Sequence, residues 1–390
     1  MKKSTLFVAL LITAIVTAQM EKPKDSTQVK FDELQQNSAE RILSGNIKSG
    51  VTVGGYGEIT YNQPETGNGE LDVQRLVLLF GYKFNDKVQF ITEIEFEHVK
   101  EVFVEQAFLQ YSFNDKFSAR GGLMLVPMGS INEYHEPTTF HSVERPSIEK
   151  SIVPTTWREI GAGVYGRFDD ISLKYQAYIF NGFASVSSSG KYLGGENGLR
   201  NGRQKGAEST FNTPTFSGKV DYYGIQGLRL GLAGYFGRSQ PDEDDEDLDG
   251  ADVGIAMVGL DARYRFGRFA ARGEIISTNV SDSEAYNDLY GADLGSQMYG
   301  WNLEASFNLL PSEKKMELWG FARYESYDTN SKMDGGVDRN LSYDRDEWTF
   351  GLSFLVANGA VLKADYQIKN NAVAGLETDN QFNVGIGVSF

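Results

Sequence analysis

Most of the chain from residue 49 onward consists of runs in which apolar and polar side chains alternate. In "WNLEASFNL", every second residue from Trp301 to Leu309 is apolar, and the residues between them are polar. A period of two residues is the pattern of a β-strand with one apolar and one polar face. Proline is almost absent from these runs, as continuous strand pairing requires. We expect sixteen strands, near residues 49–62, 70–84, 86–98, 101–113, 116–127, 156–169, 171–184, 214–224, 226–238, 251–266, 267–279, 296–310, 315–327, 345–358, 359–369 and 380–390.

The connections between these runs alternate in length. Tight connections, such as "NDK" at 85–87 and "NG" at 358–359, follow every second strand, and the others are mostly long, with a short exception around His98. Short turns at one end and long loops at the other are typical of transmembrane β-barrels. We therefore predict an all-β protein, a closed antiparallel transmembrane β-barrel of 16 strands, with short periplasmic turns and long extracellular loops.

Such a barrel presents its apolar face to lipid and its polar face to a water-filled interior. Backbone groups in lipid must be paired, so the last run, "NQFNVGIGVSF", should pair with the first and close the sheet. Its final aromatic residue, Phe390, resembles the signal by which the outer-membrane assembly machinery recognises barrels.

The N-terminal run "MKKSTLFVALLITAIVTAQ" has two lysines, an apolar core and small residues before Gln19. This is the pattern of a secretory signal peptide. We expect a signal peptide at 1–18, a periplasmic segment at 19–48 that is either a short helix or a flexible lead, and the barrel at 49–390. The expected location is the outer membrane of a Gram-negative bacterium.

Charge and cysteine content narrow the functional classes. Without Lys2 and Lys3 of the signal peptide, the net charge changes from −16 to −18. A strongly acidic chain argues against nucleic acid as a partner. The chain has no cysteine, so its stability has to come from a large core or a continuous hydrogen-bonded sheet and not from disulfide bonds.

Charged residues of both signs fall on the face that we expect to line the channel. The basic candidates are Arg75, Arg120, Arg167, Lys174, Arg229, Arg263, Arg265, Arg268, Arg272 and Arg323. The acidic candidates are Glu93, Glu95, Glu97, Asp261, Glu274 and Glu304. Sixteen strands leave an aqueous bore, and its selectivity depends on the charges at its narrowest point.

The long connection 128–155 is the best candidate for a loop that folds inward and constricts this bore. It combines aliphatic and aromatic anchors with charged residues, and a loop of this length is either functional or disordered. Its candidate constriction residues are Glu133, His135, Glu136, His141, Glu144 and Arg145.

Two patterns are candidates for metal binding. Asp245, Asp247 and Asp249 alternate before Gly250, as in calcium loops, but the closing position holds Ala256, and a solvated acidic loop explains the run as well. His135 and His141 lie six residues apart and lack a defined third ligand. We expect no cofactor, with calcium at the acidic loop as the exception to test.

Three segments resemble a known family: "VQRLVLLFGYKFNDKVQFITEIEFE", "VFVEQAFLQYSFNDKFSARGGLMLVPMG" and "ERPSIEKSIVPTTWREIGAGVYGRF". They look like the early strands of the phosphate-selective porin O/P family, and the resemblance extends over roughly residues 50–390. The run at 120–129 is similar to the family's strand that leads into its constriction loop. The resemblance implies a trimeric outer-membrane porin with sixteen strands and a preference for anions.

The leading interpretation is a porin for passive diffusion of small hydrophilic solutes or ions, with anions such as phosphate as candidate solutes. The partners would be outer-membrane lipid, the solutes and two further copies of the chain. A non-channel barrel that serves as a surface scaffold is the alternative, motivated by the long loops. An enzyme is not expected, since no Ser/His/Asp arrangement stands out around the three histidines.

Overall fold

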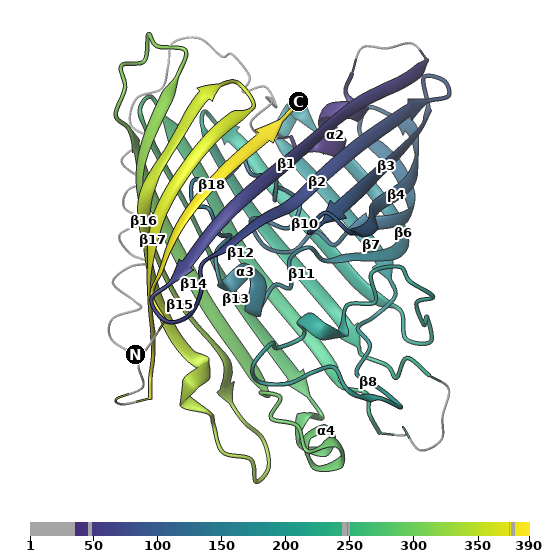
Figure 1. The fold of residues 1–390 in the computed structure, drawn as a ribbon. Helices are drawn as coiled ribbons and strands as arrows, with labels where there is room; N and C mark the ends of the chain where they lie inside the picture. Colours follow the sequence, from purple (N-terminus) through teal and green to yellow (C-terminus); the bar gives the residue numbers. More distant parts are fainter. Residues whose placement is uncertain (1–35, 46–48, 244–247, 249, 374, 376–378) are drawn as a thin grey trace.

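The computed structural model describes residues 36–45, 49–243, 248, 250–373, 375 and 379–390. Sixteen strands form one closed antiparallel barrel in which each strand pairs with its neighbours in the chain, and β18 pairs with β1 (Figure 1). The predicted closed barrel of sixteen strands is thereby confirmed. Its strands are β1 (Gly50–Pro64), β2 (Glu70–Lys83), β3 (Val88–Glu97), β4 (Glu101–Asn114), β5 (Phe117–Leu125), β6 (Arg158–Phe168), β7 (Leu173–Phe180), β10 (Thr215–Ile225), β11 (Leu228–Arg238), β12 (Gly254–Phe266), β13 (Phe269–Ser281), β14 (Gln297–Asn308), β15 (Glu317–Lys332), β16 (Asp344–Ala357), β17 (Ala360–Asn371) and β18 (Gln381–Ser389).

The seam between the first and last strands is continuous. The register runs from Tyr56 opposite Ser389 to Pro64 opposite Gln381. Beyond β18, the amide of Phe390 donates to the carbonyl of Gly55 at 2.9 Å, and the amide of Gly55 donates back at 3.0 Å. The backbone groups at the seam are thus paired, as a sheet in lipid requires.

The two faces of the sheet have the polarity predicted for a transmembrane barrel. On β14, Leu303 and Phe307 are 37% and 47% exposed on the outside, whereas Asn302 and Glu304 face inward and are 4% and 1% exposed. Water-facing side chains are normally the exposed ones. Here the inward polar side chains are buried because other segments of the chain fill much of the interior.

Those segments are one loop and one short helix. The loop 126–157 follows β5, contains α3 (Ile148–Ser151) and is mostly buried inside the barrel. The helix α2 (Ser38–Leu43) precedes the barrel and contacts β1, β2 and β3 near the end with the short turns (Figure 1). None of the helices in the described residues is long and apolar enough to cross a membrane.

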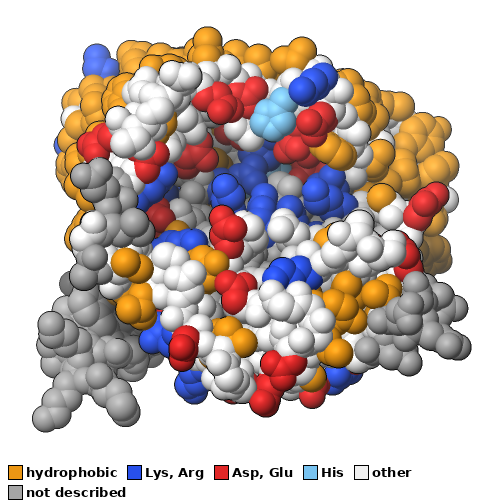
Figure 2. Space-filling model, turned by 60° about the horizontal axis from the view of Figure 1, so that its bottom comes forward, with side chains coloured by type: hydrophobic (Ala, Val, Ile, Leu, Met, Phe, Trp, Pro, Cys, Tyr) orange, Lys and Arg blue, Asp and Glu red, His pale blue; other side chains and the backbone are white. Residues whose placement is uncertain are grey.

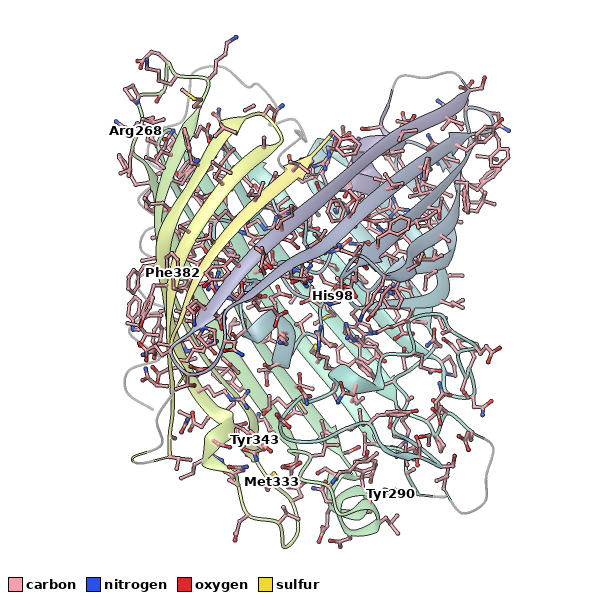
Figure 3. The ribbon with its side chains drawn as sticks, in the orientation of Figure 1. His98, Arg268, Tyr290, Met333, Tyr343 and Phe382 are labelled. Atoms are coloured by element: carbon pink, nitrogen blue, oxygen red, sulfur yellow. The ribbon has the colours of Figure 1, made fainter. Side chains whose placement is uncertain are left out.

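The end with the long loops carries the smaller elements. These are β8 (Val186–Ser187), β9 (Gly190–Lys191), η3 (Arg200–Gly202), α4 (Ser283–Tyr290) and η5 (Leu341–Tyr343), while η2 (Asp169–Ile171) lies in a turn at the opposite end. Tyr290, Met333 and Tyr343 mark the long-loop end in Figure 3, and Arg268 marks the short-turn end. Residues 1–18, predicted to be a signal peptide, and the acidic run with Asp245, Asp247 and Asp249 lie outside the described residues.

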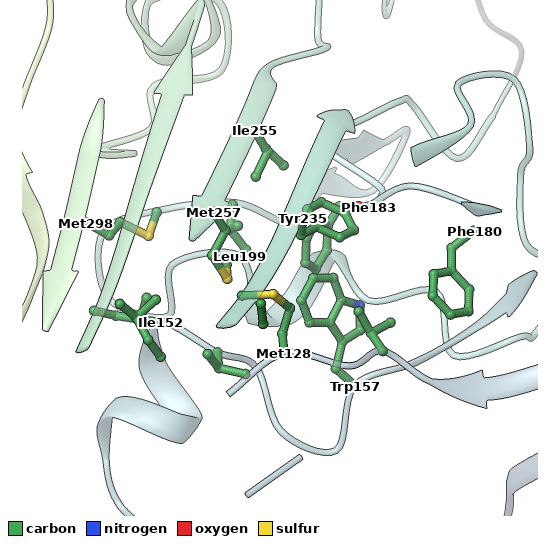
Figure 4. Close-up of a cluster of buried hydrophobic side chains, with 14 of the residues drawn as sticks. Met128, Ile152, Trp157, Phe180, Phe183, Leu199, Tyr235, Ile255, Met257 and Met298 are labelled. Carbon is green, nitrogen blue, oxygen red and sulfur yellow. The ribbon is translucent and has the colours of Figure 1, made fainter. Parts of the chain in front are cut away.

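An apolar cluster anchors the loop 126–157 inside the barrel (Figure 4). Trp157 is fully buried, with its ring centroid 4.7 Å from those of both Phe183 and Tyr235. Met128 and Ile152 of the same loop belong to this cluster, together with residues of β11, β12 and β14. The inward face is therefore not uniformly polar: it becomes apolar where the loop packs against it.

Candidate functional site: a constricted, charged pore

The loop 126–157 crosses the interior of the barrel and contacts strands around the wall. The Nζ atom of Lys219 on β10 donates to the carbonyl of Gly129 at 2.7 Å. The Nζ atom of Lys363 on β17 donates to the carbonyl of Ser142 at 2.8 Å, and Nδ2 of Asn62 on β1 donates to Glu144 at 2.6 Å. Contacts to such distant parts of the wall make this loop the constriction of the pore.

The charged residues of this loop face partners on several strands. Both carboxylate oxygens of Glu133 accept from Nε2 of Gln176 on β7 at 2.9 Å. Glu136 forms an ion pair with Arg41 of the N-terminal segment at 2.5 Å. His135 faces β1 and β4, whereas His141 faces β14. The two histidines therefore do not share a site.

Glu304 on β14 is the centre of a charged network at the constriction. Its Oε1 lies 2.9 Å from Nδ1 of His141 and 3.2 Å from Nε of Arg272, and its Oε2 lies 3.5 Å from Nη1 of Arg323. Burial lowers the pKa of His141 from its ordinary value, an effect that the hydrogen bond to Glu304 opposes. Arg323 also pairs with Glu325 at 2.9 Å, so the two arginines of this network face two carboxylates.

A second network covers the wall at β7, β10, β11 and β12. Lys219 pairs with Asp261 at 2.8 Å, and Arg229 lies 3.3 Å from Asp221 and 3.5 Å from Asp261. The ring of Tyr134, from the constriction loop, lies between Arg229 and Arg263, whose guanidinium carbons are 4.3 and 4.2 Å from its centroid. The alternating charges largely neutralise one another here, and they hold the loop against this wall.

The helix α2 extends this network toward the short-turn end. Its cap is reciprocal: the side chain of Asn37 accepts from the amide of Glu40, and the Glu40 side chain accepts from the amide of Asn37. Glu40 also accepts from Nζ of Lys174 at 2.8 Å and from the hydroxyl of Tyr165 at 3.1 Å. Burial opposes its ionisation, but Lys174 holds the pKa of Glu40 below its ordinary value. The sequence pattern did not single out Glu40.

At the long-loop end, basic side chains gather in the hollow of the mouth (Figure 2). Arg200 and Arg203 both donate to the carbonyl of Thr155, and Arg203 also donates to that of Pro154 at 3.0 Å. Arg158 and Lys205 lie over the same ring, that of Phe103, at 5.6 and 5.9 Å. Burial and the neighbouring Arg200 and Arg158 lower the pKa of Arg203 to about 9. We call Arg158, Arg200, Arg203 and Lys205 the mouth cluster.

The mouth cluster differs from the two networks in its distance from carboxylates: Glu97, Glu105 and Glu159 act on it, but from beyond ion-pair distance. Within the described residues, none of its four side chains forms an ion pair. Burial lowers the pKa of the Arg200 guanidinium to about 10, and the nearby Arg145 of the constriction loop adds to this effect. The four cluster residues were absent from the sequence-based candidates, because three lie in a loop and Arg158 is the first residue of its strand.

The remaining basic candidates occupy different places. Arg75 is buried against Glu58 at 2.7 Å, and Arg120 lies over the ring of Tyr165 at 3.7 Å. Arg167 and Arg265 lie near the short-turn end, where they pair with Asp169 and Glu317. Arg268 does not line the bore: it lies in the turn between β12 and β13, over the ring of the outward-facing Phe307. A turn residue has no fixed place in the strand alternation, so parity assigned Arg268 to the wrong face.

The acidic candidates fall into two groups, those in the networks that hold the loop and those on β3. Asp261, Glu274 and Glu304 lie in the networks that hold the loop, Glu274 accepting from Nδ2 of Asn302 at 2.6 Å and from the amide of Ser130 at 3.1 Å. Glu93 and Glu95 are buried, and Glu97 is partly exposed. The structure adds Glu58 and Glu105 to this acidic wall.

A closed barrel with a polar interior, an apolar outer face and an inward loop is the architecture of an outer-membrane porin. Residues 46–383 match the family described as phosphate-selective porin O and P. The chain belongs to this family, which confirms the resemblance seen in the sequence. The chain is 34% identical over 337 residues, 82% of its length and 76% of the relative's, to an uncharacterized protein of Aquifex aeolicus.

Solved structures show the same fold at low sequence identity. The anion-selective porin from Comamonas acidovorans aligns with a TM-score of 0.58 and 15% identity, covering 88% of this chain and all of the porin. The trimer form of OmpT from Vibrio cholerae aligns with a TM-score of 0.58 and 11% identity over the same shares. The protein is thus a porin of the Gram-negative outer membrane, a channel for small solutes, and its family and fold are those of non-enzymatic channels.

Proposed function

We propose that this porin conducts anions, with small oxyanions such as phosphate as the preferred class. The observation that carries the proposal is the mouth cluster at the long-loop end, four cations that form no ion pair within the described residues. Unpaired cations attract anions and raise their local concentration. A guanidinium matches two oxygens of a phosphate at once, so arginines favour oxyanions over halides.

We assign the anion preference to the mouth and not to the network around Glu304. In that network Arg272 and Arg323 contact Glu304, but Arg323 also pairs with Glu325 at 2.9 Å, so charges of both signs are present. The acidic net charge of the chain does not oppose this, because the charges near the path, and not the total, decide selectivity. The anion-selective porin with the same fold is consistent with the preference.

We also propose that the protein acts as a homotrimer embedded in outer-membrane lipid. The support is the band of exposed apolar side chains on the outer face, together with the trimer form of the similar Vibrio protein. Assembly by the outer-membrane machinery follows from the same architecture. Calcium binding at Asp245, Asp247 and Asp249 stays a prediction.

Reversal potentials in planar bilayers test the anion preference. In asymmetric potassium chloride, the wild-type channel should give the sign expected for chloride permeation, and added phosphate should reduce the chloride current. The double variant Arg200→Gln/Arg203→Gln should lower the anion-to-cation permeability ratio several-fold. The matched control is Arg238→Gln, because Arg238 lies outside the mouth cluster and is paired with Asp252 at 2.6 Å and Asp282 at 2.9 Å. A cation preference in the wild type contradicts the proposal.

A further inference from the structure

Three buried side chains on the inner wall converge where the constriction loop meets the barrel. Glu93 comes from β3, Glu105 from β4 and His135 from the loop, and one ligand atom of each lies within 4.8 Å of the others. Their exposed fractions are 1%, 0% and 3%. Neither the conduction path at the mouth nor the Glu304 network uses these residues.

A β-bulge aims Glu105 into this cluster. Glu93 pairs with Gln106 and the next residue, Ile94, pairs with Val104, so Glu105 is the extra residue on β4. The burial pattern shows the effect: Glu105 and Gln106 are adjacent in the chain and both buried, whereas outward residues alternate on either side of them. Bulges re-aim side chains in this way and are frequent next to functional sites.

The imidazole of His135 is oriented by its own hydrogen bond. Its Nδ1 lies 2.6 Å from the carbonyl of Asn132, and a carbonyl only accepts, so Nδ1 carries the proton. Its Nε2 then faces Oε2 of Glu105 at 3.3 Å and the hydroxyl of Tyr56 at 2.8 Å. A neutral imidazole with its second ring nitrogen held by a backbone carbonyl is the form that binds metals.

The carboxylates of the cluster have oxygens that nothing in the structure satisfies. Oε1 of Glu93 and Oε1 of Glu105 are buried without a hydrogen-bond partner. The second oxygen of Glu93 accepts only from Nε2 of Gln106 at 2.6 Å, and that of Glu105 from the Tyr56 hydroxyl at 3.1 Å. Buried carboxylate oxygens are normally paired or coordinate a metal, because leaving them unpaired is costly.

Charged groups of both signs surround the cluster. The acidic groups are Glu58, Glu93, Glu95 and Glu105, and the arginines that act on them are Arg75, Arg145 and Arg158. Arg75 is nearest to Glu58, at 2.7 Å, and lies 3.9 Å from Glu95. Lys363 also acts on Glu58, so the four acidic groups face four basic ones, and a bound cation would satisfy the unpaired carboxylate oxygens.

We propose that Glu93, Glu105 and His135 form a binding site for one divalent transition-metal ion such as zinc. An imidazole beside carboxylates favours such metals over calcium or magnesium, which take oxygen ligands alone. Two ligands about 2 Å from a shared tetrahedral ion lie about 3.3 Å apart, the separation of His135 Nε2 and Glu105 Oε2. The hydroxyl of Tyr56 lies beside the site. The bound ion would tie the constriction loop to β3 and β4.

Zinc content of the purified full-length porin tests this site. The protein is stripped with a chelator, equilibrated with zinc, freed of excess metal and measured by mass spectrometry. The wild type should retain one zinc ion per chain, and Glu105→Gln and His135→Gln should each weaken zinc affinity by more than about 100-fold, because each removes a direct ligand. The matched controls are Glu97→Gln, on the same face of β3, and His98→Asn, in the loop after β3, and both should bind zinc as the wild type does.

The result that overturns the site is zinc retention that is absent in the wild type or unchanged in Glu105→Gln and His135→Gln. Folding of each variant is checked by the heat-dependent shift in gel mobility that intact barrels show. If the variants do not fold, X-ray absorption spectroscopy of the zinc-loaded wild type identifies the ligands of the zinc ion and tests the site directly. One imidazole nitrogen with carboxylate oxygens supports the site, and a zinc shell without imidazole overturns it.

Discussion

Glu40 of the N-terminal helix accepts a hydrogen bond from Nζ of Lys174 on β7 at 2.8 Å, with both side chains buried inside the barrel. The pair joins a segment that precedes the barrel to its inner wall. Removing one partner of a buried ion pair costs about 3–5 kcal/mol when the other stays buried. When Glu40 is removed, the helix can avoid this cost by leaving the lumen. Water then enters the lumen and solvates Lys174.

We therefore expect Glu40→Gln to release α2 and widen the pore. Single-channel recording should show a larger conductance and, because the lumen loses the negative charge of Glu40, a stronger anion preference. Ser44→Ala, at the exposed end of the same helix, is the control and should leave the conductance unchanged. An unaltered conductance in Glu40→Gln would mean that α2 does not narrow the path.

The selectivity should depend on pH through His141. Its pKa is lowered chiefly by burial, with Arg272 and Lys363 adding to the effect and Glu304 opposing it. The imidazole is therefore neutral at pH 7 and gains a proton only below its ordinary pKa of about 6.5. We expect the anion preference to rise as the pH falls from about 6.5 to 5, a range set by that ordinary value.

The same titration affects stability. A pKa that is lowered in the folded state means that the folded protein favours the neutral imidazole. The contribution of His141 to the free energy of unfolding is therefore complete above the ordinary pKa of histidine and is lost as the pH falls through the lowered pKa.

Reversal potentials measured between pH 8 and 5 in the wild type and in His141→Gln check the selectivity. An equal change in both would assign the pH dependence to another group.

The packing of Trp157 should hold the constriction loop in place. Its ring is fully buried between Phe183 and Tyr235, so Trp157→Ala leaves a large cavity. Such a truncation in a packed core costs about 3–5 kcal/mol. Urea unfolding of the barrel in lipid should show this loss, and channel recordings should show more frequent closures.

Phe211→Ala provides the comparison for Trp157, since Phe211 is 56% exposed in a long loop. Its unfolding free energy should stay within about 0.5 kcal/mol of the wild type, as for most surface substitutions. A similar loss in both variants would show that the cluster around Trp157 does not stabilise the loop.

Gly129, at the start of the constriction loop, should not tolerate a side chain. It has a φ of +73°, and a Cβ atom there would lie 2.5 Å from a carboxylate oxygen of Glu149. That carboxylate accepts from the amides of Ser130 and of Ile131, the latter at 2.7 Å. Gly129→Ala should displace Glu149 and loosen the loop, seen as noisier open-channel current. Gly336→Ala, in a position with open space, should behave as the wild type.

The number, order and facing of the strands followed from the sequence alone. Alternation with period two specifies which side chains share a face, and in lipid every backbone group has to be paired, so the sheet must close. This reasoning placed Glu93, Arg272, Glu304 and Arg323 on the inner wall without further information. It also marked the long connection at 128–155 as the constriction, from its length and its mixture of anchors and charges.

The alternation of side chains along a strand no longer predicts which face a residue occupies where the backbone departs from regular pairing. Glu105 and Gln106 both face inward because a bulge on β4 shifts the alternation by one residue, and no residue in that strand announces the bulge. Arg268 lies over an outward ring because it belongs to a turn. In the mouth cluster, Arg200 and Arg203 come from one loop and Arg158 comes from the end of a strand. Neither the periodicity of the sequence nor the spacing of these residues predicts that they lie close together.

The sequence by itself determined that the chain forms a closed, polar-lined barrel of sixteen strands, because periodicity and backbone pairing are local properties that each strand carries. Only the tertiary structure decided which charges are paired, which are left unpaired at the mouth, and that Glu40 reaches Lys174 across 134 positions of the chain. Coulomb interactions depend on distances in space, and those distances are set by how the loop and the helix fold back into the lumen.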